Sequence, residues 1–503
     1  MIELSNQSAR PHIDVKLVLG ILGSFVFFLG FALMVPAGVA VLYNETTWQA
    51  FLLSAGIALL LGSGLYWVFR PRYEVRIREG FLIVSLTWLF LSLVGALPFV
   101  LSGILDNYTD AVFETMSGLT TTGATILGGT TAGGQEIPIV EDLPKSLLFW
   151  RSLAHWLGGM GIIVLSIAIL PLLGVGGMQM FQAESPGPSA EKLTPRVQET
   201  AKLLWFVYVA FTFAEFLLLW LHPAMSWFEA INHAFSTLAT GGFSTNSSSI
   251  EGFSSVYIDV IITIFMFLAG INFAMHFRLM RGETNSFFQN RELRFYTIIC
   301  LIGILAISFS LWISNNFNIG EALRYGSFQA VSIITTTGFG TNDYELWNYF
   351  AAFLLFLLFF TGGCAGSTGG GIKMIRWLIL LKNTGREMRQ IIHPKAILPI
   401  RVGKKSIDPN IQRTVLSFFV LYILIFGLGA LSMAALGQDL MSSIGASIAC
   451  LGNIGPAWGD FGPTDNYAQL PIAGKWILII MMMVGRLELF TVLIVFTPTF
   501  WSR

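Results

Sequence analysis

Long apolar segments alternate with short polar ones along almost the whole chain of 503 residues. A helix needs about 20 consecutive apolar residues to cross a bilayer. We predict that ten segments do so: 16–43, 49–69, 80–103, 146–174, 203–222, 254–277, 295–314, 347–382, 412–437 and 472–498. Because this number is even, both termini are expected on the same side of the membrane.

Four further segments have helical periodicity but are too short to cross. Each has about 11–14 residues, which predicts a half-helix that enters the membrane and turns back: 110–120, 227–240, 322–335 and 440–451. Each is followed by a short glycine-centred strip and then by a span. The unit of span, half-helix, strip and span therefore occurs four times after two N-terminal spans, which indicates internal pseudo-symmetry.

These patterns predict an all-α polytopic membrane protein, with two N-terminal helices and four pseudo-symmetric repeats of helix, pore half-helix, filter and helix around one pore. We place the two-helix preface at 1–79 and the repeats at 80–176, 177–282, 283–383 and 384–503, the last including a basic cytoplasmic loop. The composition agrees, since 54% of residues are hydrophobic and only 12% are charged, against roughly 25% charged in soluble domains.

The pattern of charged residues predicts which loops face the cytoplasm, and the cysteine pattern disfavours a metal site. Residues 373–413 hold ten Lys/Arg against two acidic residues, while alternate loops are acidic. The positive-inside rule then predicts that the basic loops and both termini are cytoplasmic. The three cysteines form no CxxC pair or Cys/His cluster, so we expect no structural metal site. The formal net charge is zero and gives no information on partners; we expect no cofactor in this chain and no nucleic-acid partner.

The four strips have the residues that a cation pore requires. Irregular backbone at membrane depth is tolerated only where it lines a water-filled path or is buried in protein. Glycine permits positive φ, which lets successive carbonyl oxygens face one axis and replace the water shell of an alkali cation, either K⁺ or, with more difficulty, Na⁺. The predicted filter consists of Thr121, Thr122 and Gly123; Thr240, Gly241 and Gly242; Thr336, Thr337 and Gly338; and Asn453, Ile454 and Gly455.

Each half-helix would aim the negative end of its dipole at this axis. The alternative is that the glycines are helix-packing patches, which are common in membrane proteins. The register is open in two strips. The second is centred on Gly241 or Gly242, and the fourth departs most from the others, with Ile454 and Pro456. The amide of Asn453 is expected to hold the fourth strip in shape.

Arg486 is a charge inside the last apolar segment. A charge at that depth is expensive and usually faces an aqueous path or a partner. We predict that Arg486 points into the pore below the filter and forms an electrostatic barrier. The alternative is a structural pair with Glu488 or with C-terminal carbonyls.

A glycine-rich stretch interrupts the eighth span, and such a density of glycine breaks a helix. We predict a flexible intramembrane loop that can obstruct the cytoplasmic half of the pore; the alternative is a kink required for packing. A phosphate-binding loop is disfavoured, because Ile372 separates the last glycine from Lys373 and no strand precedes it. Lys373 and Arg376 are expected to mark the membrane boundary. The gate candidates are Gly362, Gly363, Gly366, Ser367, Thr368, Gly369, Gly370, Gly371 and Arg486.

Three titratable residues are weaker candidates. His155 is expected to be buried and neutral. Glu114 and Glu229 lie in the first two half-helices, where they either attract cations at the mouth of the pore or bond to neighbouring backbone.

Over nearly its full length the chain resembles the TrkH-type subunits of the Trk/Ktr/HKT superfamily of potassium transporters. The resemblance rests on residues 120–125, 240–245, 335–341 and 452–456, on the glycine-rich stretch and on Gly-Arg-Leu-Glu in the last span. It implies gated uptake of K⁺ across the plasma membrane, the inner membrane of a bacterium. It also implies a homodimer with one pore per subunit and a cytosolic nucleotide-binding regulatory Trk subunit.

The resemblance assigns ion binding to the filter glycines, gating to the loop of the third repeat and a position beneath the filter to Arg486. Glycine at position 123, where some relatives carry serine, implies selectivity for K⁺. A transporter of organic solutes is disfavoured because the repeats run in the same direction. A membrane enzyme is disfavoured because no HExxH or GxSxG motif occurs. Channel-like flux and symport with H⁺ or Na⁺ both remain open.

Overall fold

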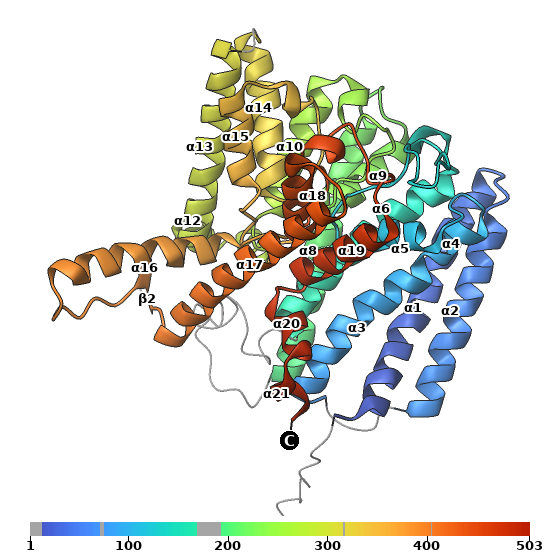
Figure 1. Ribbon diagram of the computed structural model, residues 1–503, viewed down its shortest axis with the longest axis horizontal. Helices are drawn as coiled ribbons and strands as arrows, with labels where there is room; N and C mark the ends of the chain where they lie inside the picture. Colours follow the sequence, from blue (N-terminus) through green and yellow to red (C-terminus); the bar gives the residue numbers. More distant parts are fainter. Residues whose placement is uncertain (1–12, 71–74, 169–192, 315–316, 404, 503) are drawn as a thin grey trace, which may run out of the picture.

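The computed structural model describes residues 13–70, 75–168, 193–314, 317–403 and 405–502, and these are mostly α-helical (Figure 1). The strands within these ranges, β1 (Arg401–Val402) and β2 (Lys405–Ser406), pair as a short antiparallel hairpin. The all-α membrane fold is therefore confirmed. The boundary at 176/177 between the first two repeats lies outside the described residues.

Six described segments are long and apolar enough to cross a membrane. They are formed by α1 (Val15–Leu42), α2 (Trp48–Phe69), α3 (Ile77–Gly95) with α4 (Leu97–Leu101), α8 (Leu193–Trp220), α13 (Arg291–Ser314) and α17 (Pro409–Ala435). The described part of the expected span 146–174 is α6 (Lys145–Ala168), and the rest of that span lies outside the described residues.

Two spans that we expected to be continuous are broken. α10 (Val256–Ala269) meets α11 (Phe273–Met280) at a bend of 99°, and α19 (Ile472–Arg486) meets α20 (Phe490–Leu493) and η6 (Ile494–Phe496) at 113°. In the first break Asn272 caps α11 by accepting the Ala274 N–H. In the second, Glu488 and Leu489 have positive φ angles of 59° and 33°, which no regular α-helix contains.

Four short helices occupy the positions of the expected half-helices: α5 (Tyr108–Leu119), α9 (Trp227–Leu238), α14 (Ile319–Ile334) and α18 (Leu440–Gly452). Each begins at a polar cap whose side chain accepts a backbone N–H of the first turn; the caps are Asn107, Ser226, Asn318 and Asp439. After each strip comes one 3₁₀ turn: η1 (Val140–Asp142), η3 (Glu251–Phe253), η4 (Tyr344–Leu346) and η5 (Gly459–Phe461).

The eighth expected span, 347–382, is not a single crossing. It consists of α15 (Tyr349–Leu358), the non-helical loop 359–373 and α16 (Met374–Ile392). α16 projects sideways from the body of the molecule, and α17 returns from it (Figure 1). The remaining short helices are α12 (Thr284–Gln289) and α21 (Pro498–Trp501).

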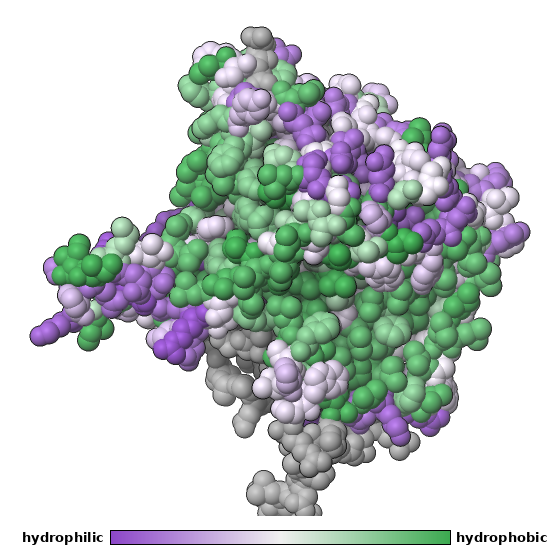
Figure 2. All heavy atoms as spheres, in the orientation of Figure 1, coloured by the Kyte–Doolittle hydropathy of each residue, from purple (hydrophilic) through white to green (hydrophobic). Residues whose placement is uncertain are grey.

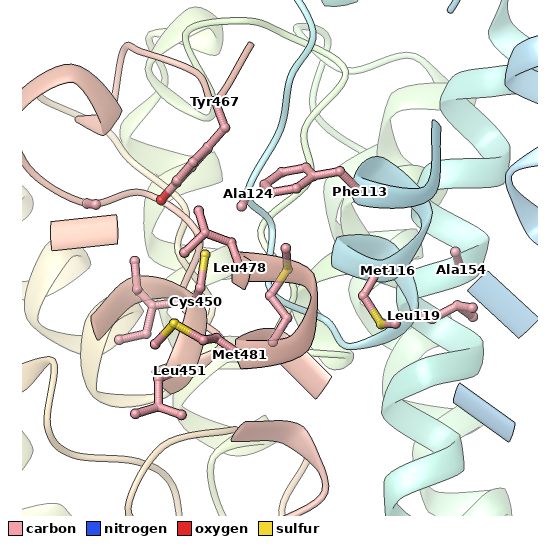
Figure 3. Packing of buried hydrophobic residues seen from close by; sticks show 14 of the residues in the cluster. Phe113, Met116, Leu119, Ala124, Ala154, Cys450, Leu451, Tyr467, Leu478 and Met481 are labelled. Atoms are coloured by element: carbon pink, nitrogen blue, oxygen red, sulfur yellow. The ribbon is translucent and has the colours of Figure 1, made fainter. Parts of the chain in front are cut away.

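Apolar side chains cover the middle of the face seen in Figure 2, while hydrophilic ones gather at its upper part and on α16. Inside the molecule, the first and fourth repeats pack directly on each other. Figure 3 shows Phe113 of α5 beside Tyr467 of the fourth repeat, with the ring centres 5.6 Å apart, and both residues are buried. The chain therefore closes on itself, with its last repeat against its first.

The two ends of the described chain lie at one face. The Asp14 N–H donates to Glu79 Oε1 at 3.1 Å, so the start of α1 lies beside the start of α3. Arg78 Nη1 donates to the Ser502 carbonyl at 2.7 Å, which brings the C-terminal end to the same place.

Candidate ion-binding site

The four half-helices end in the same backbone motif. The N–H of one residue in each strip donates to the carbonyl five residues earlier: Thr122 to Ser117 (2.9 Å), Gly241 to Ser236 (2.8 Å), Thr337 to Ser332 (2.8 Å) and Ile454 to Ala449 (2.9 Å). This 6→1 bond defines the Schellman ending of a helix, which needs a left-handed residue. The left-handed residues are Thr121 (φ 51°), Thr240 (56°), Thr336 (60°) and Asn453 (56°).

Three of these four left-handed residues are threonines, although glycine or asparagine usually fills this position. A β-branched residue with positive φ is a conformational outlier. Backbone strain of this kind costs about 1–3 kcal/mol per residue and gathers at functional sites.

Two residues further on, each strip has a glycine with positive φ: Gly123 (82°), Gly242 (81°), Gly338 (83°) and Gly455 (98°). The shared spacing from the left-handed residue makes these four glycines equivalent. In the second strip Gly242, and not Gly241, occupies this position. In the fourth strip it is Gly455.

The four strips contact one another in a closed ring. A Cβ atom on each of these glycines would collide with a backbone carbonyl oxygen of the next strip: on Gly123 with that of Gly241, on Gly242 with that of Thr337, on Gly338 with that of Ile454, and on Gly455 with that of Thr122. The order follows the chain and the fourth strip closes on the first. Four segments distant in sequence thus surround one axis, and there is no room for a side chain at any of the four glycines.

Threonine hydroxyl groups and one asparagine amide form hydrogen bonds within and between the strips. The Thr122 and Thr337 hydroxyls lie 2.8 Å from those of Thr120 and Thr335. Asn453 Nδ2 donates to Thr122 Oγ1 and to the Met482 carbonyl, both at 2.9 Å. The amide therefore joins the fourth strip to the first and to α19, whereas we had expected it to hold its own strip in shape.

Loop 359–373 lies against the ends of three half-helices. Thr368 Oγ1 donates to the Leu238 carbonyl of α9 at 2.9 Å, and the Gly370 N–H donates to Thr336 Oγ1 at 2.6 Å. A Cβ atom on Gly370 would lie 2.5 Å from the Gly452 carbonyl oxygen of α18. The loop thus occupies the space next to the ends of the second, third and fourth half-helices.

The other glycines of the loop allow it to fold closely on itself and on α10. A Cβ atom on Gly362 would collide with the Gly370 carbonyl, and one on Gly363 would meet Ser367 Oγ and the Gly270 carbonyl. Gly366 and Gly371 have positive φ angles of 77° and 61°, and a Cβ atom on Gly369 would lie 2.8 Å from the Thr335 carbonyl.

Arg486 ends α19 and bridges the loop to the first repeat. Its Nη1 donates to the Thr368 carbonyl at 2.6 Å, and its Nη2 lies 3.5 Å from the Gly158 carbonyl of α6. The side chain is buried. Of the alternatives considered for Arg486, the pair with Glu488 is wrong, because Glu488 binds Arg376 at 2.5 Å. The carbonyls that Arg486 contacts lie in the loop and in the middle of α6, and not at the C-terminal end of a helix.

Lys373 and Arg376, which we expected to mark the membrane boundary, are both buried inside the protein. Lys373 Nζ donates to the Gly369 carbonyl within the loop. Arg376 pairs with Glu488 and lies 3.9 Å from the centre of the Phe418 ring. Buried charges persist where partners compensate for lost solvent. Hydropathy alone cannot reveal partners that come from another span.

The weaker candidates have structural partners. Glu114 is buried and accepts from Arg151 Nε at 2.8 Å and from the Ile126 N–H at 3.1 Å. Glu229 accepts the Ser226 N–H at 2.7 Å in the capping box of α9. His155 is buried and stacks on Phe243, with the ring centres 4.1 Å apart. The backbone-bonding alternative therefore holds for both glutamates.

The sequence reasoning missed two buried ion pairs. Arg151 with Glu114 joins α6 to α5, and Lys475 with Asp110, at 2.5 Å, joins α19 to α5. Arg151 and Lys475 stand inside or at the edge of apolar segments, which is the same signal that identified Arg486. Among the described residues no group of three or more His, Cys, Asp or Glu could hold a metal ion. The oxygens that lie against the four equivalent glycines belong to backbone carbonyls.

Residues 47–503 match the family model TrkH, described as cation transport protein. The chain belongs to the TrkH family. It is 41% identical over 494 residues to the Trk system potassium uptake protein TrkH of Halomonas elongata, covering 97% of this chain and 100% of that protein. It is 42% identical over 488 residues to the protein of the same name from Escherichia coli K12, covering 96% and 98%.

The fold is also similar to the crystal structure of the potassium transporter TrkH from Vibrio parahaemolyticus, with a TM-score of 0.88, 37% sequence identity and coverage of 97% of this chain and 100% of that one. Membership of a family of cation transport proteins removes the alternative of a membrane enzyme.

Proposed function

We propose that this TrkH-family chain takes up K⁺ through the axis that its four strips enclose. The observation that carries the proposal is the closed ring, in which each of four glycines with positive φ lies against a carbonyl oxygen of the next strip. Carbonyl oxygens replace the hydration shell of K⁺ in selective pores. The relatives named as potassium uptake proteins support the same ion.

The half-helices supply the electrostatic field for such a site. All four end at the strips, so their C-terminal ends, each equivalent to about half a negative charge, point toward the axis. Glu114, the acidic residue nearest to the first strip, is already neutralised by Arg151. We infer that cation binding depends on backbone dipoles and not on carboxylate charge.

We infer that loop 359–373 and Arg486 form the gate. The loop contacts the inner ends of three half-helices, and Arg486 ties it to the opposite wall of the pore through the Thr368 and Gly158 carbonyls. A fixed positive charge at this place opposes the passage of a cation. Displacement of the loop together with Arg486 would open the path.

The distribution of Lys and Arg along the chain indicates which segments lie in the cytoplasm. The positive-inside rule assigns the basic segment 373–413 and the termini to the cytoplasm, and the bacterial relatives support a place in the inner membrane. We propose that the chain acts as a homodimer and binds a cytosolic nucleotide-binding regulatory subunit. α16, which projects from the body and carries much of this basic segment (Figure 1), offers that subunit a surface.

Uptake of ⁸⁶Rb⁺ into vesicles that contain the full-length protein tests the proposal. We expect uptake to follow an imposed voltage, negative inside, and to be inhibited more strongly by K⁺ than by Na⁺. Uptake that also requires a gradient of H⁺ or Na⁺ would assign the chain to symport, whereas uptake driven by voltage alone would assign it to channel-like flux. Vesicles that take up no Rb⁺ above protein-free controls under any of these gradients would contradict the proposal.

A further inference from the structure

Tyr467 connects the fourth strip to the first. Its hydroxyl donates to the Gly455 carbonyl at 2.8 Å, and its backbone N–H donates to the Thr125 carbonyl, just beyond the first strip, also at 2.8 Å. The residue lies in the segment between η5 and α19, outside both strips. One buried residue therefore bonds to the first strip's flank through its backbone and to the fourth strip through its side chain, at the point where the ring of strips closes.

The Tyr467 ring is held rigidly. It stacks on Phe461 with the ring centres 4.6 Å apart and the planes 5° from parallel, and it lies 5.6 Å from Phe113 of α5. Figure 3 shows the ring beside Ala124 and Phe113, with its hydroxyl directed away from Phe113. Only 2% of the residue is exposed. Burial and stacking of the ring direct its hydroxyl at the Gly455 carbonyl.

This bond makes the fourth strip different from the other three. Within the described part of the chain, no protein hydrogen bond reaches the carbonyls of the equivalent glycines Gly123, Gly242 and Gly338. A carbonyl oxygen has two lone pairs, so the Gly455 oxygen can accept from Tyr467 and still face a cation. The donated proton draws electron density from the oxygen and limits its movement.

The hydrogen bond from Tyr467 weakens the Gly455 oxygen as a ligand and restricts its movement, and both changes affect which cation binds more strongly. A weaker, fixed oxygen favours the larger ion K⁺, because Na⁺ needs a stronger or closer ligand to offset its tighter hydration shell. We propose that Tyr467 is a specificity-determining residue, which sets the preference for K⁺ over Na⁺ by its hydrogen bond to the Gly455 carbonyl. The inference rests on the proposed role of the strips as the filter.

The test is the substitution Tyr467→Phe, which keeps the ring and removes the hydroxyl. The matched control is Tyr344→Phe. The Tyr344 hydroxyl is also buried and also donates to a carbonyl of the fourth repeat, that of Ala457 at 2.6 Å, but Ala457 lies beyond the strip. A third variant, Gly338→Ser, alters the filter itself. Each full-length protein is placed in vesicles, and the Na⁺ concentration that halves ⁸⁶Rb⁺ uptake is compared with the corresponding K⁺ concentration.

This ratio does not depend on the amount of folded protein, so partial loss of a variant does not obscure the result. We expect Tyr467→Phe to lower the preference for K⁺ over Na⁺ about fivefold, which corresponds to about 1 kcal/mol at 1.4 kcal/mol per tenfold, while Tyr344→Phe leaves it unchanged. An unchanged ratio for Tyr467→Phe beside a lowered ratio for Gly338→Ser would overturn the role of Tyr467 alone. Equal losses in the two tyrosine variants would overturn it as well, because they would indicate general loosening of the repeat. If all three variants kept the parental ratio, the filter proposal itself would fail with it.

Discussion

Replacing Arg486 by alanine removes the bridge between loop 359–373 and the first repeat. The guanidinium donates to the Thr368 carbonyl of the loop at 2.6 Å and reaches the Gly158 carbonyl of α6 at 3.5 Å. Alanine provides neither bond and carries no charge. The loop then keeps its contacts with the half-helices, including the bond from the Gly370 N–H to Thr336. It loses the bridge to α6 that the Arg486 side chain provides.

The size of the effect follows from the geometry. A hydrogen bond from a charged donor contributes about 1.5–3 kcal/mol net, and the bond to Thr368 is short. The contact with Gly158 is at the limit of hydrogen-bond length and adds little. The loop either occupies the position described above, between the half-helices, or is displaced from it. A loss of about 2 kcal/mol shifts this equilibrium toward the displaced loop by roughly 30-fold. If most molecules of the parent protein have the loop in place, ⁸⁶Rb⁺ uptake by Arg486→Ala rises by up to this factor, and removal of the positive charge from the pore raises uptake further.

The assay is initial ⁸⁶Rb⁺ uptake into vesicles, normalised to the amount of folded protein. Arg486→Lys separates the two contributions, because lysine keeps the charge but lacks the planar fork of donors; its uptake should lie between those of the parent and the alanine variant. Arg413→Ala, which removes an exposed cation from α17, is the matched control and should match the parent. Unchanged or reduced uptake by well-folded Arg486→Ala would refute the reasoning.

Three further predictions concern the filter, the loop and the packing of the repeats. Gly338→Ser should reduce the preference for Rb⁺ over Na⁺, because serine at a φ of 83° costs about 1–2 kcal/mol and its Cβ would displace the next strip. The control Gly340→Ser, where a Cβ atom has space, should leave this preference unchanged. Equal effects of the two substitutions would argue against a specific filter position. Deletion of residues 366–369 should raise Rb⁺ uptake, and a fall in uptake with normal folding would count against gating by the loop. Asp110→Asn should lower the melting temperature, because it leaves the buried Lys475 ammonium unpaired, which costs about 3–5 kcal/mol. Adding Lys475→Met should restore most of the lost stability. A double variant no more stable than Asp110→Asn would show that loss of the ion pair is not the cause.

Much of the helical framework follows from hydropathy and periodicity. Segments of about 20 apolar residues and shorter amphipathic ones can be told apart by length alone, and the four short helices lie where the sequence places them. The breaks at 270–272 and 487–489 contain polar residues, Asn272 and Glu488, but hydropathy averaged over a span does not distinguish a bent span from a straight one. Their cause is local backbone geometry, such as the positive φ angles of Glu488 and Leu489.

The candidate site could be predicted in its residues but not in its contacts. Glycine and threonine content identifies the strips, and a charge in an apolar span identifies Arg486. The bonds of Arg486 to Thr368 and of Tyr467 to Gly455 join segments that are distant in sequence or separated by a loop. Such contacts depend on how the repeats pack around the axis, and no periodicity in the sequence records that packing.

The central claim is that the four strips together bind the transported ion. Rb⁺ scatters X-rays anomalously, so a diffraction map of crystals grown in Rb⁺ locates the ion directly. The account predicts an anomalous peak on the axis among the strips, within coordination distance of backbone carbonyls from all four, including the Gly455 carbonyl that Tyr467 holds. A map with no peak on this axis, and with Rb⁺ bound elsewhere in the membrane region, would contradict it.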